Sequence, residues 1–272
     1  MKHNNRVMWV IILAASLLLF AFFAQDKIQA LKEELPAHLQ KAMENPPDSP
    51  DLPNVLIIGD SISIGYTVAV RRLLDGKADV FRPMTNCNHS GTGVRGVKKW
   101  IVGRKWDVIH FNFGIWDTHC LHNGIWVTDR SKYKTEDLKR RHTTEQYVEN
   151  LSKIVAILKK SGAKLIWAST TPYVSYGEDT RLLVVKNNKA ARELMDKEGV
   201  TVNDLYSLAI ENLKGWQSKD GCHFTRQGYG ELARQVAPTI SDALSKKARA
   251  TRPASEDGQG QLCQEFTWSI EG

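Results

Sequence analysis

Two short segments of the chain hold the three residue types that together can transfer an acyl group. The sequence Gly-Asp-Ser occupies residues 59–61, directly after an apolar run, and Asp-Gly-Cys-His occupies residues 220–223. A serine hydroxyl is a weak nucleophile that needs a base, and histidine is suited to take its proton near neutral pH. A carboxylate three residues before that histidine can accept its other N–H and fix its tautomer. The spacing therefore predicts Ser61 as nucleophile, His223 as base and Asp220 as the orienting carboxylate.

The chain around these residues alternates between strand-like and helix-like segments. Apolar runs predict strands at residues 55–59, 78–84, 106–114, 163–172 and 200–205. Periodic apolar positions and stop signals predict helices at residues 67–76, 97–103, 143–162, 184–199 and 226–244. This alternation predicts an α/β fold with a central parallel sheet and helices on both faces.

The predicted sheet explains how distant segments could form one site. Right-handed crossovers put the carboxyl ends of all parallel strands along one edge, where ligands bind in such folds. Residues 59–61, 112–117 and 220–223 all fall at this edge. Residues 118–142, which are polar, charged and aromatic, are predicted as a long loop. Loop tryptophans either stack on sugar rings or fill packing gaps, and the candidates are Trp116, Trp126 and Trp216.

The two motifs, in this order and with these flanking elements, resemble those of the SGNH hydrolase superfamily, which includes the GDSL-type esterases and lipases. The resemblance covers roughly residues 54–245. It implies a three-layer α/β/α flavodoxin-like fold and a triad of Ser61, Asp220 and His223. It also implies that a glycine after the second strand donates an N–H to the oxyanion. Gly91 is the best match for this glycine, and Gly93 is a near rival.

A third segment departs from the family pattern. The family usually has G-x-N-D, whose asparagine donates to the oxyanion, but residues 114–117 read GIWD, so Trp116 occupies the asparagine position. Asn112 is the candidate substitute; the alternative is a strand-end asparagine that satisfies backbone groups. The run FNFGIWD also resembles, more weakly, a block of the PC-esterase group of sugar O-acyl esterases. That likeness implies carbohydrate esters as substrates.

The sequence thus predicts a serine esterase that hydrolyses acyl esters, preferably acetyl esters and possibly those of carbohydrates. Two alternatives stay open: a non-catalytic carbohydrate-binding protein on the same fold, and a sugar O-acyltransferase that passes the acyl group to a second alcohol. The expected partner is a small-molecule or polysaccharide ester. Neither a metal nor an organic cofactor is expected, and the oligomeric state is left open.

Other candidate motifs carry weaker signals. Residues 91–96, GTGVRG, match the dinucleotide-binding pattern, but the preceding strand and the following helix are too short for that unit. Three histidines on predicted loops are interpreted as solvated side chains, since no spacing rule joins them to a carboxylate: His89, His119 and His122. His110, in the middle of a predicted strand, is expected to be a core residue.

The N-terminal region predicts export. Residues 8–24 carry no charge, follow Lys2 and Arg6, and indicate either a signal anchor or a signal peptide over residues 1–24. Positive charge before the apolar run keeps the N-terminus inside. The rest of the chain would then be membrane-anchored outside the cytoplasm, or secreted or periplasmic after cleavage. We expect a membrane-proximal linker at residues 25–53, the hydrolase domain at 54–245 and a flexible tail at 246–272.

Composition limits the remaining function classes. With 272 residues, 42% of them hydrophobic and 25% charged, the chain has an ordinary globular balance. Its net charge of +7 is scattered, so no nucleic-acid partner is expected. Export permits disulfides among the four cysteines, and a Cys87–Cys120 pair is the preferred interpretation because both follow predicted strands.

Overall fold

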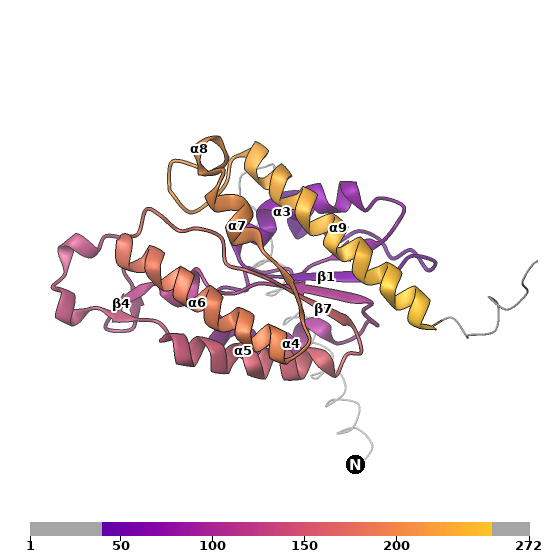
Figure 1. Cartoon of the computed structure of the whole chain (residues 1–272), viewed down its shortest axis with the longest axis horizontal. Helices are drawn as coiled ribbons and strands as arrows, with labels where there is room; N and C mark the ends of the chain where they lie inside the picture. Colours follow the sequence, from indigo (N-terminus) through magenta and orange to yellow (C-terminus); the bar gives the residue numbers. More distant parts are fainter. Residues whose placement is uncertain (1–39, 252–272) are drawn as a thin grey trace, which may run out of the picture.

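The computed structural model describes residues 40–251, and Figure 1 shows a sheet covered by helices. The sheet has five parallel strands in the order β2-β1-β3-β7-β8. Their bounds are β1 Asn54–Ile58, β2 Asp79–Phe81, β3 Val108–Phe111, β7 Lys164–Ala168 and β8 Thr201–Asn203. The predicted α/β class with a central parallel sheet is therefore confirmed.

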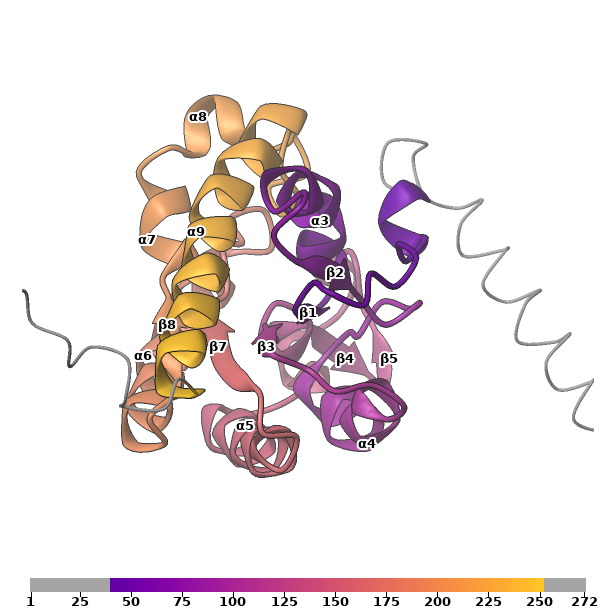
Figure 2. The same ribbon diagram turned by 90° about the vertical axis from the view of Figure 1, so that its right-hand side faces the viewer.

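Helices form a layer on each face of this sheet (Figure 2). One layer contains α3 Ser61–Leu73, α7 Leu205–Ile210 and α9 Arg226–Thr251, with the short α8 Leu213–Trp216 beside it. The other layer contains α4 Ser90–Ile101, α5 Thr144–Lys159 and α6 Glu178–Lys197. Alternate residues of β1 feed the two layers: Val55 and Ile57 pack with α3 and α9, and Leu56 and Ile58 pack with α4 and α5. Burial on both faces explains the continuous apolar run in the sequence.

Three helices begin earlier than the sequence predicts, and one of them is α6, which starts at Glu178, not Val184. Helix α3 starts at Ser61, not Thr67, because the Asp60 side chain accepts the N–H of Ile62 at 3.0 Å and caps the helix. Helix α4 starts at Ser90, not Val97, and the carboxylate of Asp117 accepts the Ser90 N–H at 3.0 Å. The pattern GTGVRG consequently lies inside α4, not in a turn before a helix.

The region predicted as a long loop at 118–142 contains ordered structure. It folds into a small antiparallel sheet with strand order β5-β4-β6, formed by Cys120–His122, Ile125–Trp126 and Lys139–Arg140. Arg130 and Arg140 both bind Asp179 at the start of α6, the former with an Nη2–Oδ2 distance of 2.7 Å. These ion pairs hold residues 118–142, which we call the insertion, against α6.

Part of the segment assigned to a linker contacts the domain. Ala42 and Met43, in a 3₁₀ turn at Lys41–Met43, are fully buried against Ile64 of α3. Ser49 donates from its N–H to Asp79 at 2.6 Å. At the other end α9 continues to Thr251, within the segment assigned to the tail. The predicted anchor at 1–24 lies outside the described residues, and within residues 40–251 no helix is long and apolar enough to cross a membrane.

The predicted Cys87–Cys120 disulfide is wrong. Both thiols are buried and form no disulfide, and the half-buried Cys222 is also free. Cys87 packs in the cluster with α4 and α5, whereas Cys120 packs in the cluster on the opposite face of the sheet. The sequence did not reveal that the sheet lies between them.

Candidate active site

Ser61 is the first residue of α3 and follows β1 after the two-residue turn formed by Gly59 and Asp60. A Cβ at Gly59 would lie 3.0 Å from the Ser63 side chain, so this turn leaves little room for a larger residue. The tight turn places Ser61 at the carboxyl edge of the sheet. There its Oγ lies 2.8 Å from Nε2 of His223.

His223 and Asp220 share a turn between α8 and α9. His223 Nδ1 lies 2.6 Å from Asp220 Oδ2, and Asp220 Oδ1 accepts the backbone N–H groups of Cys222 at 3.0 Å and His223 at 2.9 Å. Gly221 has φ +64°, and a Cβ there would lie 2.6 Å from the Ser175 side chain, so the turn requires glycine. Partial burial works against ionisation, but the hydrogen bonds from Cys222 and His223 outweigh it and lower the pKa of Asp220. Asp220 is thus a carboxylate that orients the imidazole.

Two backbone amides at this edge are free to bind an anion. The N–H groups of Ser61 and Gly91, in the first turns of α3 and α4, donate to no group among residues 40–251. The strands that precede these helices, β1 and β2, are neighbours in the sheet. Free amides in the first turn of a helix favour negative charge. Gly93, the rival of Gly91, is buried against the ring of Phe113 and the side chain of Ile154.

Asn112 lies where β3 ends, beside β1. Its side-chain amide donates to the backbone carbonyl of Ala168 at 2.7 Å, which is the strand-end role considered as the alternative. The amide nitrogen carries a second hydrogen, for which residues 40–251 provide no partner. Asn112 is therefore a structural residue with one donor to spare.

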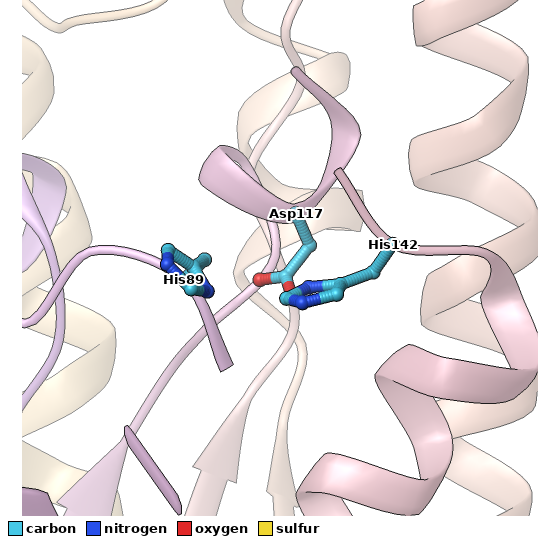
Figure 3. Close-up of side chains that lie close together, drawn as sticks. All are labelled: His89, Asp117 and His142. Carbon is cyan, nitrogen blue, oxygen red and sulfur yellow. The ribbon is translucent and has the colours of Figure 1, made fainter. Parts of the chain in front are cut away.

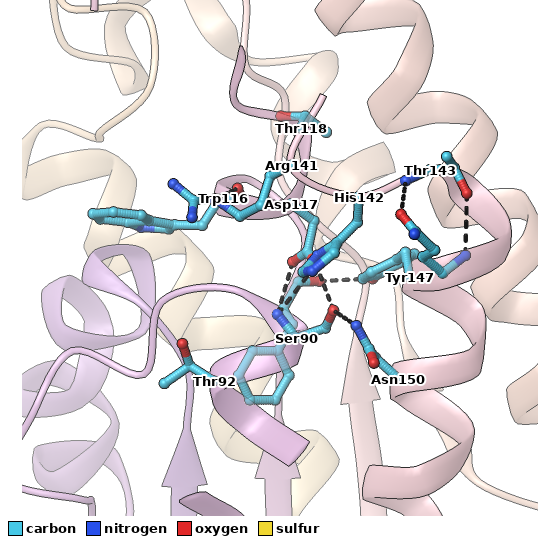
Figure 4. A network of polar contacts seen from close by, with 12 residues as sticks. Ser90, Thr92, Trp116, Asp117, Thr118, Arg141, His142, Thr143, Tyr147 and Asn150 are labelled. Carbon is cyan, nitrogen blue, oxygen red and sulfur yellow. Dashed lines mark hydrogen bonds and ion pairs between the residues drawn. The ribbon is translucent and has the colours of Figure 1, made fainter. Parts of the chain in front are cut away.

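A buried polar network, which the sequence analysis did not identify, holds the start of α4 (Figure 4). Asp117 has no exposed surface and accepts the N–H and the hydroxyl of Ser90, and its Oδ1 lies 2.6 Å from Nδ1 of His142. Asn150 of α5 donates to the Ser90 hydroxyl at 3.0 Å. Asp117 is the aspartate of the G-x-N-D-like block, and that position was the available signal. The network fixes the helix that carries Gly91.

Two buried ionisable side chains, Asp60 and Arg82, lie next to the turn that precedes Ser61. Burial raises the pKa of Asp60 to about 6, and its Oδ2 has no hydrogen-bond partner in the described chain. Arg82, also buried, donates to the carbonyl groups of Gly59 at 3.4 Å and Thr85 at 3.3 Å. Arg82 thereby braces the turn that precedes Ser61.

Aromatic side chains gather around the insertion. Trp126 stacks on His119 with ring centroids 4.4 Å apart, and Trp116 lies 5.5 Å from Trp126. Tyr173 stacks on Tyr176 beside them, at 5.4 Å. The third candidate tryptophan, in α8, packs instead with the cluster that contains α9. Two of the three predicted tryptophans therefore come together.

The histidines differ from the solvated side chains that the sequence predicts. His119 is 3% exposed within the aromatic group, and burial lowers its pKa to about 3. His89 is half-buried, and burial together with nearby Arg141 lowers its pKa to about 4. His122 lies 4.6 Å from the ring of Tyr133. The core assignment of His110 is confirmed, because it is fully buried.

Comparisons with known proteins agree with this fold. The model of the GDSL-like Lipase/Acylhydrolase family matches residues 57–230, and no curated protein matches the chain. A lipase/acylhydrolase from Enterococcus faecalis superposes with TM-score 0.56 at 20% identity, over 70% of this chain and 96% of that one. The acetylxylan esterase Axe2 from Geobacillus stearothermophilus superposes with TM-score 0.56 at 18% identity, over 69% of this chain and 94% of that one. The acetyl xylan esterase AlAXEase superposes with TM-score 0.54 at 14% identity, over 69% of this chain and 99% of that one.

Proposed function

The chain belongs to the GDSL-like lipase/acylhydrolase family and hydrolyses ester bonds, and we propose that it is a serine esterase that removes acetyl groups from carbohydrates. One observation carries the assignment of its catalytic residues. Ser61 Oγ lies 2.8 Å from His223 Nε2, and His223 Nδ1 lies 2.6 Å from Asp220 Oδ2. These contacts match what a serine nucleophile, its base and an orienting carboxylate require.

In the proposed first half-reaction, Ser61 Oγ attacks the ester carbonyl carbon while His223 Nε2 takes the hydroxyl proton. The imidazolium that forms is stabilised by Asp220, which stays ionised because its pKa is lowered. When the tetrahedral intermediate collapses, the C–O bond to the alcohol breaks and His223 returns the proton to the leaving oxygen. The products are the free alcohol and an acyl group on Ser61.

The negative charge that develops on the carbonyl oxygen needs donors. We assign this role to the unpartnered N–H groups of Ser61 and Gly91, with the spare amide hydrogen of Asn112 as the third donor. Each such donor contributes about 3 kcal/mol to lowering the barrier. In the second half-reaction, water attacks the acyl carbon while His223 takes its proton. The bond from that carbon to Ser61 Oγ then breaks, His223 returns the proton to Oγ, and the acid is released.

A carbohydrate substrate is supported by the aromatic group on the insertion. Trp116 and Trp126 contact each other, and Trp126 keeps 38% of its surface exposed. Aromatic faces of this kind can cover the apolar face of a sugar ring. Two of the proteins with a similar fold are acetylxylan esterases.

We also propose that the enzyme acts outside the cytoplasm, at a membrane or after release from it. The support is the uncharged run at residues 8–24 preceded by Lys2 and Arg6. The test is a fusion of residues 1–53 to a reporter enzyme that is active only after export from a bacterial host. Reporter activity supports export, and a reporter that is made but inactive contradicts it.

A covalent serine probe tests the catalytic proposal. The full chain, in detergent, is treated with a fluorophosphonate, and the modified peptide is identified by mass spectrometry. We expect modification at Ser61, which Ser61→Ala abolishes. The matched control is Ser63→Ala, because Ser63 lies two residues after Ser61 but is buried, and its hydroxyl donates to the Asp60 carbonyl at 2.7 Å.

The same experiment separates the alternative functions. A folded wild-type chain that is not labelled would contradict the esterase and favour a carbohydrate-binding protein. A labelled chain that transfers the acyl group to an added alcohol faster than to water would favour an acyltransferase.

A further inference from the structure

We propose that His89, Asp117 and His142 form a binding site for one divalent transition-metal ion of the Zn²⁺ type. Each residue offers one ligand atom, and these atoms all lie within 4.8 Å of one another (Figure 3). The three side chains come from the segment before α4 and from the two ends of the insertion. None of them contacts the ester in the proposed hydrolysis, and Asp117 affects it only by holding the start of α4.

His89 provides the first independent observation. Its Nδ1 is buried and has no hydrogen-bond partner within residues 40–251, and its side chain does not cap α4. A buried nitrogen left unpaired costs about 1–3 kcal/mol, which a bond to a metal ion would recover. The ring centre lies 5.1 Å from that of His142. The imidazole of His89 therefore has an unpaired nitrogen and already lies beside the imidazole of His142.

Gly91 makes this approach of the two rings possible. A Cβ at that position would lie 3.0 Å from His89 Nδ1 and 3.3 Å from His142 Cε1. The absence of a side chain at Gly91 thus leaves room where the imidazoles meet. The same glycine carries one of the amides assigned to the oxyanion, so the proposed ion lies next to the active site.

Asp117 provides the carboxylate and its supporting bonds. Its oxygens accept the N–H and the hydroxyl of Ser90, whose hydroxyl oxygen in turn accepts from Asn150. Carboxylates that bind metals are held by hydrogen bonds of this kind, which fix the orientation of the ligand. The carboxylate is consequently preorganised by groups on α4 and α5.

The donor set identifies the class of metal. Two imidazoles and one carboxylate suit Zn²⁺ and related ions, whereas Mg²⁺ and Ca²⁺ prefer oxygen ligands. Zn–N bonds are about 2.0–2.1 Å long, so His89 must move toward the other two ligands, and it has no hydrogen bond that resists this. His142 Nδ1 and Asp117 Oδ1, which lie 2.6 Å apart, must separate slightly to admit the ion between them. The ion replaces the proton between His142 Nδ1 and Asp117 Oδ1, and that proton leaves to solvent.

The position of the ligands indicates what the ion does. Asp117 and His142 lie at the two ends of the insertion, and the backbone N–H of His142 donates to the backbone carbonyl of Asp117 at 3.2 Å. A bound ion would join this base of the insertion to the segment that starts α4. Because the unfolded chain does not preassemble the three ligands, the ion stabilises the folded state.

The test is a metal titration of the full chain, purified in detergent and freed of metal with a chelator. We expect one equivalent of Zn²⁺ to bind, to raise the melting temperature, and to be replaced by Co²⁺ with the visible absorption of a tetrahedral site. His89→Ala and His142→Ala should each weaken binding by at least about tenfold and abolish the rise in melting temperature. Mg²⁺ should give neither effect.

The matched control is His122→Ala, because His122 lies on the same insertion but outside the cluster. It should bind Zn²⁺ as the wild type does. Since His89 makes no side-chain hydrogen bond, His89→Ala should keep the melting temperature of the metal-free wild type, which shows that the variant is folded. A wild type that binds no stoichiometric Zn²⁺, or a folded His89→Ala variant that binds it equally well, overturns the proposal.

Discussion

The buried carboxylate of Asp117 accepts hydrogen bonds from both the N–H and the hydroxyl of Ser90, the first residue of α4. The next residue is Gly91, whose amide we assign to the oxyanion. In the proposed mechanism, Asp117 therefore acts on catalysis by holding the start of this helix in place.

Asp117→Ala should reduce both stability and turnover. It leaves the donors of Ser90 and His142 without their buried acceptor, which should lower the free energy of unfolding by about 3 kcal/mol. A shift of the Gly91 amide by about 1 Å should lower kcat by up to about 100-fold. Urea denaturation and ester hydrolysis, both with chelator present, measure the two effects.

The control for this variant is Asp196→Ala, since Asp196 is exposed on α6. It should change the free energy of unfolding by no more than about 0.5 kcal/mol. Equal effects of the two substitutions would show that Asp117 does not hold α4.

Asp60 should make stability depend on pH. Burial raises its pKa from 3.8 to about 6, so its contribution to folding is complete below pH 3.8 and is lost as the pH rises through about 6. Asp60→Asn removes this titration, and its amide oxygen can still cap α3. Between pH 4 and pH 7 the wild type should lose about 3 kcal/mol of unfolding free energy relative to the variant. Parallel curves of unfolding free energy against pH would mean that Asp60 has an ordinary pKa.

Asp220→Asn should lower kcat by about 10,000-fold while leaving the fold intact. The amide oxygen can still accept the N–H groups of Cys222 and His223, but the amide nitrogen stabilises the wrong imidazole tautomer. Steady-state kinetics and thermal unfolding measure the two properties. Retention of more than a tenth of the wild-type kcat would remove Asp220 from the proposed triad.

Trp126→Ala should separate sugar binding from chemistry. If Trp126 stacks on the sugar, KM for an acetylated xylo-oligosaccharide should rise about two- to tenfold, and hydrolysis of p-nitrophenyl acetate should not change. Ile125→Ala is the control, because Ile125 is the neighbouring residue in β5 and is also exposed. If both variants behave alike with both substrates, Trp126 does not contact the sugar.

The sequence predicts the sheet well because its signals are local. The run VLII in β1 is apolar on both faces, and this pattern is visible without knowledge of the neighbouring elements. The starts of α3 and α4 are different, because Asp60 and Asp117 determine them and the second of these acts from a distant segment. The strands of the insertion have only two or three residues, too few for a periodic signal.

The candidate site divides in the same way. Ser61, Asp220 and His223 lie in two short motifs, so the sequence brings them to attention before any geometry is known. No spacing rule links His89, Asp117 and His142, which are brought together only by the return of the insertion to α4. The contact of Asn112 with the Ala168 carbonyl likewise depends on which strand lies beside β3.

Hydrolysis of p-nitrophenyl acetate by the full chain tests the central claim most directly. The wild type and Ser63→Ala should both turn over the ester, and Ser61→Ala should lose at least about 1,000-fold in kcat with an unchanged melting temperature. Such a result would assign the nucleophile to Ser61. A folded Ser61→Ala variant that hydrolyses the ester as fast as the wild type would contradict the account.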